Sequence, residues 1–251
     1  MVVSIVQRKG GSGKTTTAQA LGAGLLRRKK KVLYVDLDSQ ANLTYALGVG
    51  NEDLTSLDVL MGTATASEAI VKTPNGDIIG ASEALAAIDL KLTDTGKEYR
   101  LREALEDVKG KYDYIIIDTS AALNVATVNA LTASDNAVIP VQADVFSLAG
   151  IGMLNDTIEQ VRKYCNPSLK IAGILITRYN GRAILSRDMQ ANVNELAEAL
   201  HTVVFKTPIR ECVSIKEAQA VRINIFDYAP KSNAAADYAA FIEEYIKRSR
   251  L

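Results

Sequence analysis

The sequence has few of the residues from which small metal or redox sites are built, with two cysteines and one histidine among 251 residues. Cys165 and Cys212 lie 47 positions apart without a CxxC spacing. One chain therefore cannot form a zinc ribbon or an iron–sulfur site from them. Two cysteines without such a framework favour a reducing cytoplasmic compartment. His201, the single histidine, precedes an apolar segment, and we expect a packing role for it.

The sequence also has no net charge and no long hydrophobic run. Its 29 Lys and Arg residues balance 29 Asp and Glu residues. This balance excludes nucleic-acid binding through overall charge and leaves only a local basic patch. No apolar run reaches the roughly 20 residues of a membrane span, and the stretch after Met1 is too short for a signal peptide. With 16 glycines and 5 prolines, the chain is not collagen-like or of low complexity.

Short apolar runs alternate with longer helical patterns along the chain. We expect strands at 2–6, 31–38, 112–118, 137–141 and 170–177, and helices that include 100–109, 148–164 and 187–200. Strands that are apolar on both faces suit a parallel sheet covered by helices on each side. The pattern predicts an α/β fold with a doubly wound, mostly parallel sheet flanked by helices on both faces. Residues 62–96 are irregular, but no linker divides the chain, and we interpret 1–251 as one domain.

The most informative segment follows the first strand and consists of Lys9, Gly10, Gly11, Ser12, Gly13, Lys14, Thr15 and Thr16. Between a strand and a helix, such glycines let backbone N–H groups converge on phosphate oxygens, and the helix N-terminus adds partial positive charge. Lys14 is placed to reach the β- and γ-phosphates, and the Thr15 hydroxyl to bind Mg²⁺. The usual pattern GxxxxGK[ST] has glycine where this chain has Arg8, with Lys9 beside it.

An alternative interpretation is a dinucleotide-binding turn. Gly11, Ser12 and Gly13 begin like GxGxxG, and Asp36 stands near the position of a ribose-binding acid. The third glycine position holds Thr16, however, and the sequence GKT has no purpose in that motif. We therefore predict a phosphate loop for a nucleoside triphosphate.

Several segments resemble one family. KGGSGKTTT at 9–17 resembles the deviant Walker A motif, KGGxGKT[ST], of the ParA/MinD ATPases, which are P-loop NTPases of the SIMIBI class. DLDSQAN at 36–42 is similar to the family's switch segment, DxDPQ[GA]N, and 112–118 resembles its Walker B strand. NALTASD at 129–135, IPVQ at 139–142 and FDYAPKSNAAADY at 226–238 are similar to ParA in particular. The resemblance extends over nearly the whole chain.

The resemblance implies a ParA-type ATPase for DNA partition, with ATP and Mg²⁺ as cofactors and weak intrinsic hydrolysis. It implies a homodimer that forms with ATP and binds DNA non-specifically, and a ParB-like, centromere-binding partner that stimulates hydrolysis. Such a protein would be cytoplasmic and associated with the nucleoid. We expect no N-terminal helix-turn-helix domain of the kind found in larger plasmid ParA proteins, and no operator-specific repression.

The resemblance also implies roles for single residues. Lys9 would cross a two-fold interface to phosphates bound by the partner subunit, and Lys14 would act within its own subunit. Asp38 matches the family's water-orienting acid. Asp36 and Asp118 are suited to holding Mg²⁺ through water. The alternative for each acid is a strand-end carboxylate that caps a neighbouring helix.

Two segments depart from the family pattern. Ser39 replaces the usual proline, and TSAA at 119–122 replaces the common CPPS after the Walker B strand. Both segments respond to nucleotide in the family, so we expect the departures to affect the timing of the switch. No arginine finger is recognisable in the chain, and no His/Ser pair indicates covalent catalysis.

Basic residues gather in two windows. Residues 170–187 contain Lys170, Arg178, Arg182 and Arg187 without an acid, and Arg210, Lys216 and Arg222 follow. Related proteins contact DNA with basic residues in these regions, so Arg182, Arg187, Lys216 and Arg222 are our DNA-binding candidates. Ser214 stands where many relatives carry arginine. Charge runs are more often solvated faces, and we expect the basic run at 27–31 only to complement the dipole of the first helix.

Three other functions remain open from the sequence. A MinD-like, membrane-associated positioning ATPase needs a C-terminal amphipathic helix. Residues 238–248 have apolar spacing, but Glu243 and Glu244 weaken attraction to anionic lipid, so we expect core packing and no stable membrane association. A metabolic synthetase of vitamin assembly would not need Lys9. A tyrosine kinase of this superfamily would carry a C-terminal tyrosine cluster, whereas the tyrosines here are scattered.

Overall fold

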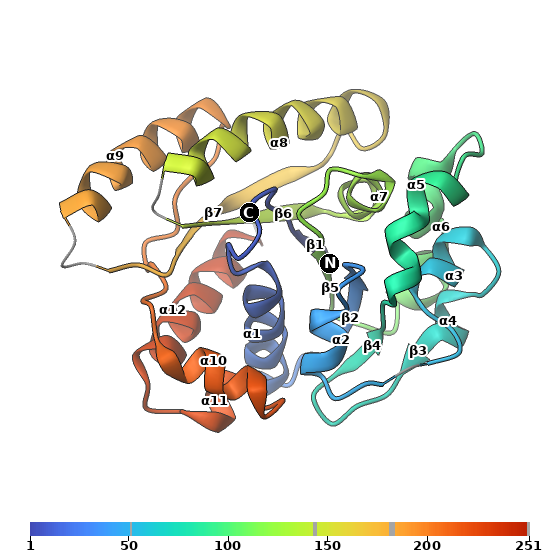
Figure 1. Ribbon diagram of the computed structural model, residues 1–251, viewed down its shortest axis with the longest axis horizontal. Helices are drawn as coiled ribbons and strands as arrows, with labels where there is room; N and C mark the ends of the chain where they lie inside the picture. The colour runs from blue at the N-terminus through green and yellow to red at the C-terminus, as the bar shows by residue number, and fades with distance from the viewer. Residues whose placement is uncertain (51, 143–144, 181–183, 250–251) are drawn as a thin grey trace.

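The structure is a computed structural model that describes residues 1–50, 52–142, 145–180 and 184–249 (Figure 1). Within these residues, seven strands form one sheet in the order β3-β4-β2-β5-β1-β6-β7. The strands are β1 (Val2–Ile5), β2 (Val32–Leu37), β3 (Ile70–Val71), β4 (Asp77–Ile79), β5 (Tyr114–Thr119), β6 (Asn136–Gln142) and β7 (Lys170–Thr177). Neighbouring strands are parallel except β3 and β4, which pair antiparallel at one edge.

Helices connect the strands and cover both faces of the sheet. In the described part of the chain they are α1 (Lys14–Arg27), α2 (Asn42–Ala46), α3 (Ser56–Met61), α4 (Ala66–Ala69), α5 (Ile88–Lys91), α6 (Arg100–Lys109), α7 (Val125–Ala133), α8 (Val145–Tyr164), α9 (Ile184–Ala199), α10 (Val213–Ala220), α11 (Ile225–Tyr228) and α12 (Asn233–Arg248). Helices α8 and α9 lie on one side of the sheet and α1 and α12 on the other (Figure 1). The predicted doubly wound α/β fold is confirmed.

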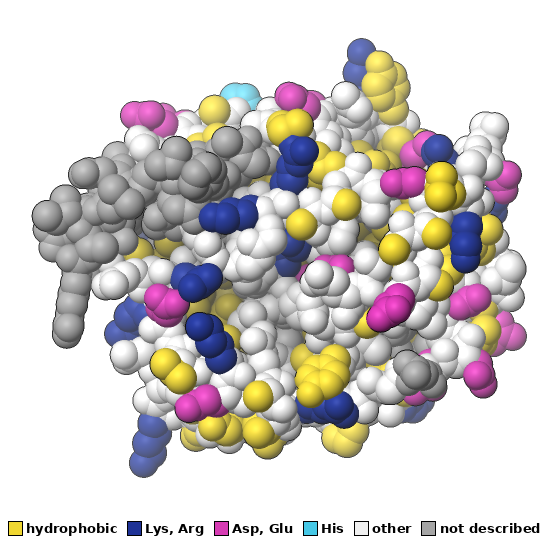
Figure 2. Space-filling view, in the orientation of Figure 1, with side chains coloured by type: hydrophobic (Ala, Val, Ile, Leu, Met, Phe, Trp, Pro, Cys, Tyr) yellow, Lys and Arg dark blue, Asp and Glu magenta, His cyan; other side chains and the backbone are white. Residues whose placement is uncertain are grey.

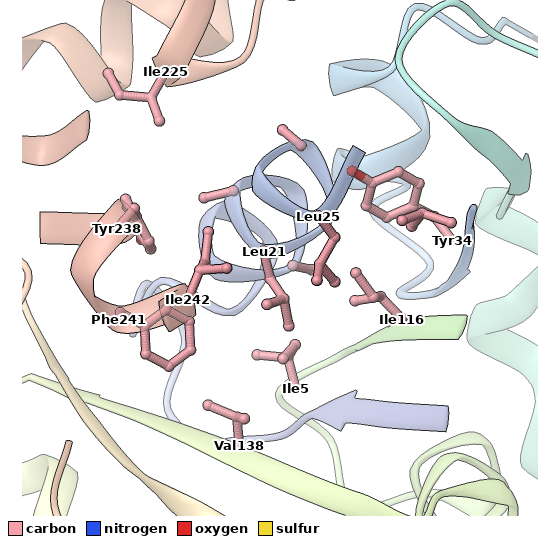
Figure 3. Close-up of a cluster of buried hydrophobic side chains, with 14 of the residues drawn as sticks. Ile5, Leu21, Leu25, Tyr34, Ile116, Val138, Ile225, Tyr238, Phe241 and Ile242 are labelled. Atoms are coloured by element: carbon pink, nitrogen blue, oxygen red, sulfur yellow. The ribbon is translucent and has the colours of Figure 1, made fainter. Parts of the chain in front are cut away.

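Three hydrophobic clusters result from this arrangement. On one face, Ile5, Ile116 and Val138 of the strands pack with Leu21 of α1 and Phe241 of α12 (Figure 3). On the other face, α3 to α7 cover β2 and β5, whereas α8 and α9 cover β6 and β7. Because both faces are buried, the strands are apolar without alternation, as a parallel sheet requires.

Helix α1 lies close to its neighbours because two of its residues have no side chain. A Cβ atom on Gly22 would lie 2.1 Å from the hydroxyl oxygen of Tyr34 in β2. A Cβ atom on Gly24 would lie 2.3 Å from the Cδ1 atom of Ile242 in α12. The two glycines therefore let the helix that follows the glycine-rich loop lie tightly between the sheet and α12.

Some predicted elements need correction. The irregular segment 62–96 contains the short strands β3 and β4, and two strands of two and three residues leave little periodic signal. Helices α8 and α9 each begin three residues earlier than predicted. The packing role of His201 is wrong, since the residue is exposed, with a φ of 50°, just after α9. The apolar residues after it contribute an isolated bridge between Val204 and Ile174.

Candidate nucleotide site

The carboxyl ends of β1, β2, β5 and β7 meet at one edge of the sheet, because these strands run parallel. A cavity of about 500 Å³ opens there. Its lining includes Gly10, Gly11, Gly13, Lys14, Thr15 and Thr16 from the predicted phosphate loop, Asp38, Ser39, Gln40 and Asn42 after β2, and Ser120 and Ala121 after β5. The fold thus brings three segments that the sequence singled out into one cavity.

The loop is held in shape by backbone geometry and by two neighbouring strands. Gly11 and Gly13 have φ values of 72° and 90°, in the left-handed region that favours glycine. The hydroxyl of Thr177 donates a hydrogen bond of 2.8 Å to the Ser12 carbonyl, and the Gln142 side chain donates to the Gly11 carbonyl. These contacts fix the loop from β6 and β7. The sequence predicted both strands but not these two contacts.

Lys14 begins α1 with a largely buried side chain. Its ammonium donates a hydrogen bond of 3.4 Å to the carbonyl oxygen of Lys9. Burial lowers the pKa of Lys14, while the nearby charges of Asp118 and Asp38 act to raise it. The lysine thus stands between the loop and two carboxylates, where an anionic ligand would add a further negative partner.

Asp118, near the end of β5, is fully buried. Neither of its carboxylate oxygens has a partner at ordinary hydrogen-bond geometry within the described residues, although the Thr15 hydroxyl lies near enough to act on its charge. Burial raises the pKa of Asp118 well above its ordinary value, the charge of Asp36 raises it further, and the Thr15 hydroxyl and Lys14 ammonium oppose the rise. A buried carboxylate without a partner is costly, so this position fits a cation or a cation-bound water.

The side chains alone do not complete a metal site. Among the described residues, no group of three or more His, Cys, Asp or Glu side chains is arranged to hold a metal ion. Mg²⁺ is usually bound by one or two protein oxygens, with phosphate and water supplying the rest. Thr15 and Asp118 therefore suit a metal that arrives with a phosphate ligand.

Asp36 is occupied by contacts within the chain. It is fully buried, and its Oδ1 accepts a hydrogen bond of 3.0 Å from the Asp38 backbone N–H. Its Oδ2 accepts from the backbone N–H and the hydroxyl of Thr44, at 2.9 and 2.8 Å. Burial raises its pKa to about 6, although these hydrogen bonds oppose the rise. Asp36 therefore anchors the segment that leads into α2, as the helix-capping alternative describes, and its metal role stays a prediction.

Asp38 lies at the start of that segment and lines the cavity. Its side chain is partly buried, and its Oδ1 accepts a hydrogen bond of 3.0 Å from the Gln40 backbone N–H. Asp38 therefore differs from the two buried acids, because it keeps access to the cavity in which a reacting water would lie.

Another wall of the cavity comes from the C-terminal part of the chain, and nothing in the sequence predicted that these residues contribute to a nucleotide site. Helix α10 lines it with Ile215, Lys216 and Gln219. The Gln219 side chain donates a hydrogen bond of 2.9 Å to the hydroxyl of Thr16. Thr16 and Gln219 are distant in sequence, and they meet because α10 folds back over the beginning of α1.

Two arginines beside this wall are engaged in ion pairs. Arg210 contacts the buried carboxylate of Asp237 with hydrogen bonds of 2.8 and 2.6 Å, which raise the pKa of Arg210. Arg178 pairs with Glu211 at 3.0 Å. These two cations therefore stabilise the loops around the cavity.

The predicted basic windows are only partly preserved in space. Lys170 begins β7 and Arg178 follows its end, so an eight-residue strand separates them by roughly 25 Å. The structure therefore divides the window at 170–187. Arg182 lies outside the described residues, and Arg187 lies in α9 with a side chain that is likewise outside them.

Lys216 and Arg222 are the DNA-binding candidates that the structure describes in full. Both are exposed, on α10 and just after it. In the run at 27–31, Arg27 pairs with Asp227 at 2.8 Å and Arg28 pairs with Glu243. These ion pairs join the end of α1 to α11 and α12, whereas the sequence predicted only that the run complements the dipole of α1.

Helix α12 uses its apolar face for the core. Tyr238, Phe241, Ile242 and Tyr245 are almost completely buried against α1 and the sheet (Figure 3). The prediction of core packing is confirmed. Among the described residues, no helix combines the length and apolar character needed to cross a membrane.

Comparisons with known proteins agree with this geometry. The family model described as AAA domain matches residues 1–171. The chain is 39% identical over 248 residues to the sporulation initiation inhibitor protein Soj of Bacillus subtilis, covering 97% of each chain. It is 37% identical over 257 residues to the chromosome partitioning protein ParA of Caulobacter vibrioides, covering 99% of this chain and 95% of ParA. The chain belongs to the Soj/ParA family.

A solved structure related to this Soj/ParA-family chain is that of cobyrinic acid a,c-diamide synthase from Mycobacterium smegmatis, with bound ATP analogue and magnesium. The two chains are 32% identical, the match covers 99% of this chain and 95% of the synthase, and the TM-score is 0.86. The fold therefore occurs in a protein with a bound nucleotide and metal.

Proposed function

We propose that this Soj/ParA-family chain is a DNA-partition ATPase that binds Mg-ATP in the cavity at the carboxyl edge of the sheet. One observation carries the proposal: the phosphate loop and Asp38 line the cavity, and the buried carboxylate of Asp118 lies close to Lys14 and Thr15 of that loop. The relatives named Soj and ParA support the partition role.

Lys14 and the backbone N–H groups of the loop would bind the β- and γ-phosphates, and Thr15 and Asp118 would hold the metal ion. When bound, Mg²⁺ neutralises phosphate charge and helps to position the phosphates. Asp118 would exchange an unpartnered buried state for a contact with this cation or its water. Asp36 would act mainly by keeping the segment from Asp38 to α2 in place.

Hydrolysis would depend on Asp38, because it is the acid after β2 that keeps access to the cavity. It would orient the attacking water rather than bind metal. Phosphoryl transfer is accelerated by positioning and by cations that neutralise developing charge. In the described part of the chain, Arg178 and Arg210 beside the cavity are held in ion pairs, so slow intrinsic turnover awaiting a ParB-like partner is the expected behaviour.

Lys9 would act between subunits. It stands at the beginning of the phosphate loop, and its carbonyl oxygen accepts a hydrogen bond from Lys14. In the proposed ATP-bound homodimer its side chain would contact the phosphates of the partner subunit. ATP would then form part of the dimer interface, and dimerisation would double the number of DNA-facing cations.

The dimer would bind DNA without base preference through Lys216 and Arg222, with Arg182 and Arg187 as further candidates. The protein would accordingly be cytoplasmic and nucleoid-associated. A MinD-like membrane role is disfavoured because the apolar face of α12 is already buried. A synthetase role would not require Lys9.

Two lysine variants test the proposal. Lys14→Ala should abolish ATP binding in calorimetry, because it removes the main cation of the phosphate loop. Lys9→Ala should bind ATP with near wild-type affinity and remain monomeric in light scattering. Unchanged affinity in Lys14→Ala would refute the phosphate site, and a normal ATP-dependent dimer in Lys9→Ala would refute the proposed interface.

A further inference from the structure

Arg222 lies two residues after the end of α10, in a backbone conformation that usually belongs to glycine. Its φ is 58°, and the flanking hydrogen bonds run from the Arg222 N–H to the Gln219 carbonyl and from the Ile223 N–H to the Ala218 carbonyl. This is a Schellman arrangement with arginine at the position where glycine is common. Any residue with a Cβ atom pays conformational free energy in this conformation, so we asked what the Arg222 side chain contacts.

The Arg222 side chain lies over an aromatic ring of another element. Its guanidinium carbon is 4.0 Å from the centre of the Tyr45 ring, a cation–π geometry. Tyr45 belongs to α2 and is 49% exposed. Figure 2 shows basic and hydrophobic side chains side by side on this face, over α2, α10 and α11. A proposed DNA contact is therefore held by a residue of α2, the helix that begins at the last residue of the switch segment.

The helix that carries Tyr45 also carries part of the cavity wall. Asn42, the first residue of α2, lines the cavity, and Thr44 is bound by the carboxylate of Asp36. A ligand that binds two arrangements of residues 38–42 with different affinity must shift the balance between them. Because α2 has only five residues, a change at Asn42 changes the position of Tyr45 as well.

We propose that Tyr45 is a positioning residue that holds Arg222 against α2 and withholds it from DNA until nucleotide occupies the cavity. The proposal rests on the proposed function, since it names a coupling between the ATP site and the DNA-binding face. Arg222 cannot keep its full contact with the ring and also extend toward a DNA phosphate. Movement of α2 on ATP binding removes the competing contact, and the cation becomes available.

The test is the affinity for random-sequence duplex, measured by fluorescence anisotropy with and without ATP over a salt series. Tyr45→Ala should raise DNA affinity without nucleotide by about two- to fivefold, the size of an exposed cation–π contact. Affinity with ATP should stay at the wild-type value. Without nucleotide, the variant's log–log salt slope should be steeper by about 0.9, the value of one additional phosphate contact.

Two controls separate this switch from a general effect on structure. Tyr45→Phe keeps the ring and should behave as wild type. In an Arg222→Ala background, Tyr45→Ala should leave DNA affinity unchanged, because the cation it releases is missing. Melting curves establish that each variant is folded, as expected for a half-exposed side chain.

The outcomes distinguish a failure of the coupling through Tyr45 from a failure of the proposed DNA-partition function. If the wild type gains DNA affinity from ATP and Tyr45→Ala matches it in both states, the coupling through Tyr45 is overturned and the proposed function stands. A loss of affinity in both states would also overturn the coupling, because it would make Tyr45 a direct support of DNA binding. If the wild type gains nothing from ATP, both proposals fail.

Discussion

Three aspartates at the carboxyl edge of the sheet have different surroundings, and those surroundings separate their roles. Asp36 and Asp118 are fully buried, whereas Asp38 is partly exposed to the cavity. Asp36 has hydrogen bonds to both oxygens, and Asp118 has no partner for either within the described residues. The hydrogen bonds of Asp36 therefore anchor the switch segment, whereas the buried carboxylate of Asp118 is left ready for a cation.

Asp118→Asn should stabilise the protein without nucleotide. Burial raises the pKa of Asp118 well above its ordinary value, so the folded protein loses stability as pH rises from about 4 through that pKa. The amide keeps the shape and removes the charge. At pH 8 we expect the free energy of unfolding to increase by roughly 1–3 kcal/mol, with a smaller gain at pH 5, measured by thermal melting.

The same variant should lose its response to ligand. Mg-ATP should raise the melting temperature of the wild type and have little effect on Asp118→Asn, because the amide is a poor partner for the cation. Equal stabilisation of both proteins by Mg-ATP would exclude Asp118 from the metal site. If Asp118→Asn melted at the same temperature as the wild type at both pH 5 and pH 8, the carboxylate would have a partner in the folded protein.

Asp38→Ala should separate binding from hydrolysis. The side chain faces the cavity and anchors only a local turn through Gln40, so its loss should leave ATP affinity and dimerisation intact. Hydrolysis should fall by about 10²-fold or more, the usual contribution of a positioned acid or base. Phosphate release and light scattering on the same sample measure both effects, and full hydrolysis would show that another group orients the water.

At the scale of elements, close packing of α1 explains why a helix of this length contains glycines. Gly22→Ala would favour an isolated helix by about 1 kcal/mol. Here the new methyl would overlap the buried Tyr34 side chain, both its hydroxyl oxygen and its ring. We expect the overpacking to dominate and to lower the free energy of unfolding by roughly 1–3 kcal/mol. Each kcal/mol should lower the melting temperature by about 2–4 °C.

Gly110→Ala provides the matched control for this packing prediction. Gly110 ends α6 with a φ of −70°, and a Cβ atom there would meet no atom within 4 Å. The control should melt within about 1–2 °C of the wild type, because surface substitutions change stability little. If Gly22→Ala melts at the same temperature as the control, the helix does not pack as closely as described.

The elements also show which parts of the site could be predicted from sequence. The phosphate loop and the buried strands follow from local signals, namely glycine spacing, GKT and uninterrupted apolar runs. Gln219 and Tyr45 could not be predicted, because each acquires its role from a contact with a distant segment, at Thr16 and Arg222. The role of Asp36 was ambiguous for the same reason, since only its contact with Thr44 distinguishes an anchor from a metal ligand.

At the scale of the whole molecule, zero net charge makes DNA binding depend on how cations are gathered. A monomer offers few cations on the face formed by α2, α10 and α11 (Figure 2), and an ATP-bound dimer would offer twice as many. Each neutralised phosphate contributes about −0.9 to the log–log dependence of affinity on salt. About five contacts in the dimer would therefore give a slope near −4 to −5 with ATP, and a shallower slope without it.

Charge reversal at two surface positions tests this arrangement. Arg222→Glu should weaken DNA binding strongly with ATP while leaving ATP-dependent dimerisation intact, because Arg222 lies on the proposed DNA-binding face and is not among the residues that line the nucleotide cavity. Lys111→Glu makes the same charge change just before β5, at the opposite edge of the sheet from the cavity, and should have little effect. Anisotropy with random-sequence duplex measures both. Equal losses in the two variants would mean that overall charge governs binding, and tight ATP-dependent binding to anionic vesicles instead of DNA would favour a MinD-like role.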